Sequence, residues 1–77
     1  MVTGGAGFIG SALIRHLIGQ SDAVVCNVDK LTYAGNLQSL GQARSSDRHL
    51  FRRIDICDAP ALRAAFAEFR PDAVMHL

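Results

Sequence analysis

Residues 3–10 read Thr3-Gly4-Gly5-Ala6-Gly7-Phe8-Ile9-Gly10. An apolar strand signal at residues 1–3 precedes the glycines, and a segment with helical periodicity follows them, so they occupy a strand-to-helix turn. Gly4 permits the sharp turn, Gly7 leaves the backbone open to an approaching ligand, and Gly10 lets the helix lie close to the sheet. The stretch therefore predicts the first turn of a βα unit.

Outward from this turn, strand signals alternate with helical segments. After residues 1–3, apolar strands are expected at residues 23–28, 49–54 and 72–77. Such alternation favours parallel strands joined by right-handed crossovers. We therefore predict an α/β fold of the Rossmann type, a doubly wound parallel sheet of which this chain forms the N-terminal half, with the strand order 3-2-1-4.

The first helix is expected from about Gly7 to Ile18, with Gly19 as its C-terminal stop. Its predicted inward stripe comprises Ile9, Ala12, Leu13, Ile14 and Leu17. A short helix with Asn36 as its N-cap is expected in the polar segment 30–47.

A second long helix is expected after the third strand. Asp58 is its predicted N-cap, Pro60 is tolerated in its first turn, and Arg70-Pro71 ends it. Its predicted inward stripe comprises Leu62, Ala65, Phe66 and Phe69.

The glycine turn and the end of the second strand together predict a dinucleotide site. Free amides near Phe8 and Ile9, aided by the helix dipole, would hold a pyrophosphate. Asp29 follows Gly10 by nineteen residues, close to the spacing expected for a ribose ligand. A carboxylate there would repel a 2′-phosphate, so NAD is favoured over NADP. Lys30 weakens this preference slightly, because a nearby cation tolerates a phosphate.

A second constellation, Asp55-Ile56-Cys57-Asp58, follows the third strand at the rim where ligands of open α/β sheets bind. Asp55 could accept a hydrogen bond from an adenine amino group while Ile56 packs on the ring. Alternatively, Asp55 only caps a turn and Ile56 belongs to the core. The spacing alone leaves both interpretations open.

The cysteines and histidines are predicted to be structural. Cys26 and Cys57 lie in apolar surroundings without a Cys-x-x-Cys spacing, so two buried thiols are favoured over a metal site or a disulfide. His16 is expected at the surface and His49 as an ordinary strand residue. His76 lies near the expected cleft, but core packing is favoured for it over catalysis.

Composition predicts part of a larger core. The chain has 77 residues, of which 49% are hydrophobic and 19% charged, with a net charge of +1. Because it contains no basic patch and no membrane-length apolar stretch, neither nucleic acid nor a membrane is expected as a partner. No signal peptide is visible, so a cytoplasmic location is expected.

The glycine stretch resembles the fingerprint of the extended short-chain dehydrogenases/reductases, which include sugar-nucleotide epimerases, dehydratases and decarboxylases. A longer segment is similar to the dTDP-glucose 4,6-dehydratases within that family, and it reads Asp29-Lys30-Leu31-Thr32-Tyr33-Ala34-Gly35-Asn36-Leu37. Asp55-Ile56-Cys57-Asp58 and residues 71–77 also resemble that subfamily. The similarity therefore covers essentially the whole chain.

The resemblance implies NAD as the cofactor. It implies that Phe8 and Ile9 lie at the pyrophosphate, residues 29–32 around the adenosine ribose, Asp55 and Ile56 at the adenine, and Leu77 near the middle of the cofactor. The complete expected binding set is Gly4, Gly7, Phe8, Ile9, Gly10, Asp29, Lys30, Leu31, Thr32, Asp55, Ile56 and Leu77.

The resemblance also implies a lyase of nucleotide-sugar metabolism. Such an enzyme converts dTDP-glucose to dTDP-4-keto-6-deoxyglucose by oxidation at C4, elimination of water and return of the hydride at C6. A nucleotide sugar is its small-molecule substrate, and a homodimer is the expected assembly.

The family's catalytic groups have no match in this sequence. Its Tyr-x-x-x-Lys helix is not represented by Tyr33, which is followed four residues later by Leu37, and its acid pair is absent. Residues 1–77 are therefore expected to be the adenosine half of an NAD-binding domain, with the catalytic half and the substrate domain outside them. Another epimerase or decarboxylase of the family, or a non-catalytic NAD-binding regulator, remains an alternative.

Overall fold

The computed structural model describes residues 1–31 and 37–77. Its strands are β1 (Val2–Thr3), β2 (Val25–Asp29), β3 (His49–Arg53) and β4 (Met75–His76). Its helices are α1 (Phe8–Gln20), the 3₁₀ segment η1 (Leu37–Ser45) and α2 (Ala59–Phe69).

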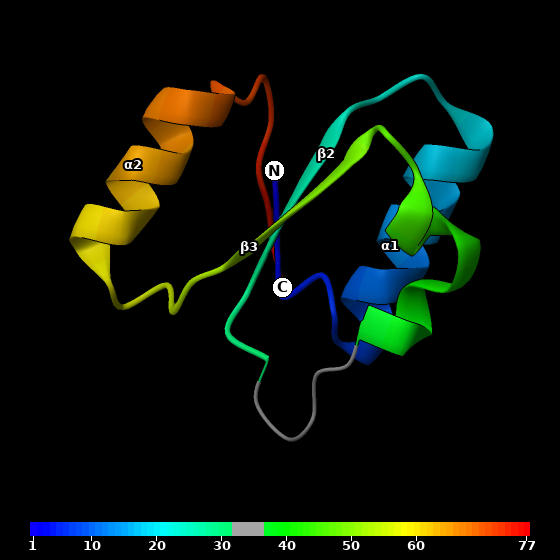
Figure 1. The fold of residues 1–77 in the computed structure, drawn as a ribbon, viewed down its shortest axis with the longest axis horizontal. Helices are drawn as coiled ribbons and strands as arrows, with labels where there is room; N and C mark the ends of the chain where they lie inside the picture. Colours follow the sequence, from blue (N-terminus) through cyan, green and yellow to red (C-terminus); the bar gives the residue numbers. More distant parts are fainter. Residues whose placement is uncertain (32–36) are drawn as a thin grey trace.

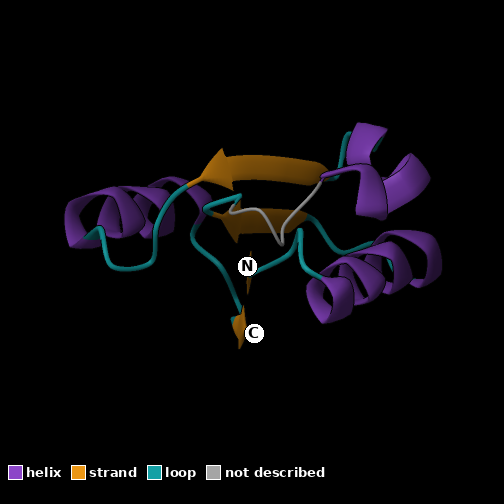
Figure 2. Ribbon diagram, turned by 90° about the horizontal axis from the view of Figure 1, so that it is seen from below, coloured by secondary structure: helices purple, strands orange, loops and turns teal. Residues whose placement is uncertain are grey.

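The strands form one parallel sheet with the order β3-β2-β1-β4. In β1, Val2 lies opposite Asn27 of β2 on one side and Met75 of β4 on the other. Helices α1 and η1 cover one face of the sheet and α2 lies on the opposite face (Figures 1 and 2). The predicted Rossmann-type fold and its strand order are therefore confirmed.

Each face of the sheet has its own apolar layer, because successive strand residues point to opposite faces. The layer beneath α1 and η1 comprises Val2, Ile14, Val25, Leu40 and Ala43. The layer beneath α2 comprises Met1, Cys26, Val28 and Ala65. Strand β2 contributes to both, as its continuous apolar run predicts.

Helix α1 differs from its prediction at both ends. Ile9 is 68% exposed and Ala12 is exposed, whereas Ile14 is completely buried. Ile9 and Ala12 lie on the face of α1 that is turned away from its buried residues Gly10, Ser11 and Ile14, and therefore away from the sheet. At the other end, the helix continues through Gly19 to Gln20, and the amide and hydroxyl of Ser21 both donate to the Leu17 carbonyl, at 3.1 Å and 2.6 Å.

Helix α2 begins as predicted. The Asp58 carboxylate accepts a hydrogen bond from the Ala61 amide at 3.2 Å, and Pro60 lies in the first turn. Arg70 ends the helix in the left-handed conformation, with φ of 53°. The inward stripe was partly wrong, because Phe66 is 38% exposed while Ala65 is buried between the partly buried Leu62 and Phe69.

The bounds of strands β2, β3 and β4 also differ from prediction. Ala23 and Val24 precede β2 and are exposed, and Ile54 follows β3. Strand β4 has two residues where six were expected, because it pairs with β1, which itself has two residues. Segment η1 begins at Leu37; the predicted N-cap Asn36 lies outside the described residues.

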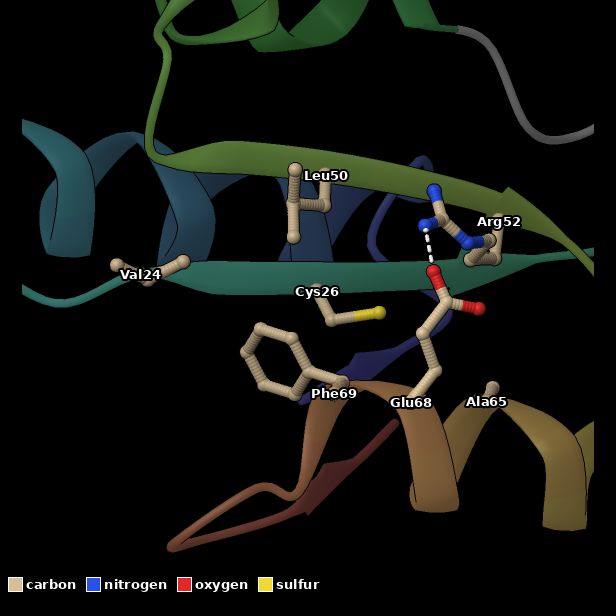
Figure 3. Close-up of a pocket in the computed structure, with 7 residues that line it drawn as sticks. All are labelled: Val24, Cys26, Leu50, Arg52, Ala65, Glu68 and Phe69. Atoms are coloured by element: carbon tan, nitrogen blue, oxygen red, sulfur yellow. Dashed lines mark hydrogen bonds and ion pairs between the residues drawn. The ribbon is translucent and has the colours of Figure 1, made fainter.

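The two cysteines lie in different environments, which corrects the prediction that both are buried. Both are free thiols, and Cys57 is exposed in the turn after β3. Cys26 is buried beside Phe69, in a cavity of about 220 Å³ between the sheet and α2 (Figure 3). Burial raises the pKa of the Cys26 thiol above its ordinary value.

Alkylation of the full-length native protein at neutral pH should therefore modify Cys57 at least about ten times faster than Cys26. The raised pKa lowers the thiolate fraction of Cys26, and burial blocks access of the reagent to its sulfur; the two effects together account for a difference of about tenfold or more. Peptide mass spectrometry after timed iodoacetamide treatment measures both rates. Unfolding in urea is the control and should equalise them; equal rates in the native protein would contradict the burial of Cys26.

Candidate functional site

A cleft opens at the carboxyl ends of the strands, with a volume of about 160 Å³. The predicted residues that line it are Gly4, Asp29, Lys30, Asp55, Ile56 and Leu77. Thr3, Val28 and His76 complete the lining. Because parallel strands end at the same edge, the fold brings together groups that are up to 74 residues apart, such as Thr3 and Leu77.

The glycine turn is held by its own backbone. Gly4 has φ of 73°, which favours glycine, and its amide donates to the Val28 carbonyl at 2.8 Å. A Cβ at Gly10 would lie 2.8 Å from the Gly4 carbonyl carbon, so Gly10 allows α1 to pack against the turn itself. Gly7 has no side chain to cover its backbone, and a Cβ there would make one tight contact, with the Gly4 oxygen at 3.3 Å.

Gly5 is a requirement of the turn that the sequence analysis missed. It is buried, and a Cβ there would collide with the side chains of Asn27 and Ile14. Only the register between β1 and β2 shows that Asn27 lies beneath the turn. The spacing of Gly4, Gly7 and Gly10 does not include Gly5. The adjacent pair Gly4-Gly5 is the one feature of the sequence that could have indicated its role.

The start of α1 presents free backbone amides. Its N-cap residue, Gly7, has no side chain that could cap the helix. The side chains of Phe8 and Ile9 are 91% and 68% exposed and do not line the described cleft, so these residues could hold an anion through their main chain. The positive end of the helix dipole adds to this capacity.

Asp29 ties the end of β2 to the glycine turn. Its Oδ2 accepts a hydrogen bond from the Ala6 amide at 2.9 Å, and its Oδ1 accepts one from the Leu31 amide at 2.7 Å. Leu31 has φ of 57°, a left-handed conformation that the second bond supports. Each carboxylate oxygen has a further lone pair, so Asp29 retains the capacity to accept bonds from ribose hydroxyls.

Asp55 and Lys30 meet across the mouth of the cleft. Lys30 Nζ lies 3.3 Å from Asp55 Oδ2, and the two side chains are 60% and 41% exposed. Asp55 Oδ1 accepts a hydrogen bond from the Cys57 amide at 2.9 Å. That bond and then Lys30 lower the pKa of Asp55 below its ordinary value. Asp55 therefore does stabilise a turn, whereas Ile56 is 45% exposed and is not a core residue.

The histidines occupy three environments. His16 is exposed, as predicted. His76 is also exposed, which corrects its predicted place in the core, and its Nδ1 lies 2.7 Å from the Thr3 hydroxyl oxygen. His49 is buried and lies within hydrogen-bonding distance of the Asn27 amide nitrogen, at 3.3 Å. His76 is exposed because β4 lies at the edge of the described sheet, with a neighbouring strand on one side only.

Two further residues of interest, Thr32 and Tyr33, lie outside the described residues. Within residues 1–31 and 37–77, no three His, Cys, Asp or Glu side chains are grouped closely enough to hold a metal ion. No helix in the same ranges combines the length and apolarity required to cross a membrane.

Comparison with known proteins gives concordant matches. The family described as GDP-mannose 4,6 dehydratase matches residues 1–77. The dTDP-glucose 4,6-dehydratase 1 of Escherichia coli strain K12 is 60% identical over 77 residues, which are 100% of this chain and 21% of that protein. The chain thus spans about a fifth of the length of this relative.

Solved structures agree with the sequence matches. A dTDP-glucose 4,6-dehydratase from Bacillus anthracis, in complex with NAD, superposes with a TM-score of 0.91 at 28% identity, covering 99% of this chain and 25% of that one. The Streptomyces venezuelae dTDP-glucose 4,6-dehydratase with NAD bound gives 0.88 at 38% identity, covering 99% and 24%. The resemblance inferred from the residues is therefore confirmed.

Proposed function

Because this chain belongs to the GDP-mannose 4,6 dehydratase family, we propose that it holds the adenosine and pyrophosphate of NAD as the N-terminal part of a dTDP-glucose 4,6-dehydratase. The observation that carries the proposal is the cleft at the carboxyl ends of the strands, which gathers Gly4, Asp29 and Asp55 from separate elements. Residues 1–77 would then be the adenosine half of the NAD-binding domain.

The described residues suit this cofactor. The open side of Gly7 gives the pyrophosphate access to the amides of Phe8 and Ile9, while Gly4 and Gly10 shape the turn. Asp29, with Lys30 and Leu31 beside it, would receive the adenosine ribose. Asp55 and Ile56 are exposed enough to receive the adenine, and Leu77 would border the cofactor further along. Thr32 belongs to the proposed ribose set but lies outside the described residues.

The residues of this chain would bind and orient the cofactor. None of them is proposed to take a proton from the sugar or to give one to it. Bound NAD would supply the acceptor for hydride from C4 and the donor that returns it to C6. No residue of this chain is assigned a catalytic role. We also propose that the full-length protein acts on a nucleotide sugar in the cytoplasm as a homodimer, without nucleic acid or a membrane as partner, by analogy with the dehydratases it resembles.

Substrate choice tests the proposed activity. The full-length protein with NAD should convert dTDP-glucose to its 4-keto-6-deoxy product and should leave GDP-mannose and UDP-glucose largely unchanged. Chromatography of the nucleotide sugars measures each conversion, and a reaction without protein is the control. Preference for GDP-mannose, or binding of NAD with no conversion of any of the three sugars, would contradict the proposed dehydratase.

Asp29→Ala in the full-length protein should weaken NAD binding about 10- to 150-fold. Hydrogen bonds to an ionised acceptor contribute about 1.5–3 kcal/mol, and this loss converts to that range of affinity. Discrimination against NADP should fall as well, because the repelling carboxylate is gone. Calorimetry measures both affinities, with Asp47→Ala as a control at an exposed acid outside the cleft. Unchanged NAD affinity would remove Asp29 from the site.

A further inference from the structure

We propose that Asp55 is a specificity-determining residue, which helps exclude a 2′-phosphorylated dinucleotide by holding Lys30 in an ion pair. The inference rests on the proposed dinucleotide function and extends it to a residue outside the ribose site. Asp29 repels a 2′-phosphate, but the adjacent Lys30 is a cation on a flexible stem that could attract one. Selection for NAD therefore requires that the Lys30 ammonium group be held by another partner, away from the phosphate.

The backbone at Lys30 is fixed from two sides. Its carbonyl accepts a hydrogen bond from Arg53 Nε at 3.3 Å, and the next amide, of Leu31, donates to Asp29 Oδ1 at 2.7 Å. With the main chain held, the position of the ammonium group depends on its side-chain rotamer. In the observed rotamer, Lys30 Nζ lies 3.3 Å from Asp55 Oδ2.

Asp55 is itself held in position to receive the lysine. Its Oδ1 accepts from the Cys57 amide at 2.9 Å, which leaves Oδ2 for Lys30. The same contacts lower the pKa of Asp55, so its carboxyl group is ionised throughout the neutral range. The pair thus joins the loop after β2 to the loop after β3 across the cleft.

The charges of the cleft give the direction of the effect. Of the charged residues that line the cleft, Asp29 and Asp55 are negative and Lys30 is positive, while Arg53 is bonded to the Lys30 carbonyl outside this lining. The lining itself therefore opposes a 2′-phosphate. Neutralising Asp55 leaves Asp29 and Lys30 alone and frees the ammonium group to approach the phosphate. Because the pair is largely exposed, the effect should be a change of several-fold and should shrink as the salt concentration rises.

The test is a double-mutant cycle on the full-length protein, with Asp55→Asn, Lys30→Met and the double variant. Asparagine keeps an oxygen for the Cys57 amide and for an adenine amino group, so losses common to both nucleotides cancel in the ratio of the NADP and NAD affinities. Asp55→Asn should raise that ratio about two- to fivefold. In the Lys30→Met background, the same change should raise it by less than half as much.

Asp58→Asn is the matched control, because it removes the same charge from the same loop while asparagine still caps α2. It should leave the affinity ratio unchanged. An unchanged ratio in Asp55→Asn, or an equal gain with and without Lys30, would overturn the inference while leaving NAD binding intact. Failure of the parent protein to bind either nucleotide would instead overturn the proposed function.

Discussion

Replacing Gly7 with valine is expected to abolish NAD binding by the full-length protein while leaving its fold intact. Gly7 has extended backbone angles, φ of −76° and ψ of 179°, that valine adopts without strain. An added Cβ would make one tight contact, with the Gly4 oxygen at 3.3 Å, which a shift of a few tenths of an ångström relieves. The new side chain would instead stand between the first amides of α1 and the pyrophosphate.

The loss should exceed about a hundredfold in affinity, because more than one hydrogen bond to a charged group would be lost, each contributing about 1.5–3 kcal/mol. Circular dichroism verifies the fold, and calorimetry measures NAD binding. Gly19→Ala is the control, since a Cβ there has nothing within 4 Å. A folded Gly7→Val protein with normal NAD affinity would show that the start of α1 is not the pyrophosphate site.

Gly10→Ala should have the opposite signature and reduce the stability of the fold itself. The added Cβ would lie 2.8 Å from the Gly4 carbonyl carbon and 2.9 Å from the Gly5 Cα. These are backbone atoms, which cannot rotate away as a side chain can, so α1 must move off the turn. Forced overpacking of this kind costs about 1–3 kcal/mol or more.

Thermal unfolding of the full-length protein without NAD measures this cost. Gly10→Ala should unfold several degrees below the parent, whereas Gly19→Ala, which adds the same methyl group to the same helix in open space, should unfold at the same temperature or slightly higher. Equal unfolding temperatures for the parent and Gly10→Ala would contradict the close approach of α1 to the glycine turn.

The parallel sheet and the place of the turn could be predicted because both follow from short-range patterns, and the strand order follows from the Rossmann-type fold that these patterns indicate. Alternating strand and helix signals fix parallel crossovers, and the spacing of Gly4, Gly7 and Gly10 marks the turn. The exposed positions of Ile9 and Phe66 could not be predicted in the same way. Periodicity identifies an apolar stripe on a helix but does not show which of two adjoining faces packs against the sheet, and Ser11 and Ala65 are buried beside the exposed Ile9 and Phe66.

The candidate site, like the fold, could be predicted from the sequence only in part. The places of Asp29 and Asp55 after strands predict both as ligands, and both also hold backbone turns. The turn at Asp55 is one of its two predicted interpretations, whereas only the structure shows the backbone bonds of Asp29. Asp29 reaches back 23 residues to the Ala6 amide, and Lys30 reaches forward to Asp55. Such contacts depend on the register between neighbouring strands, and no spacing along the chain encodes them.

The most direct test is the crystal structure of the full-length protein with NAD. We expect the pyrophosphate oxygens within hydrogen-bonding distance of the Phe8 and Ile9 amides, and the adenosine ribose hydroxyls on the Asp29 carboxylate, which should keep its bonds to Ala6 and Leu31. A pyrophosphate placed away from the start of α1, or a ribose with no contact to Asp29, would contradict the proposed site.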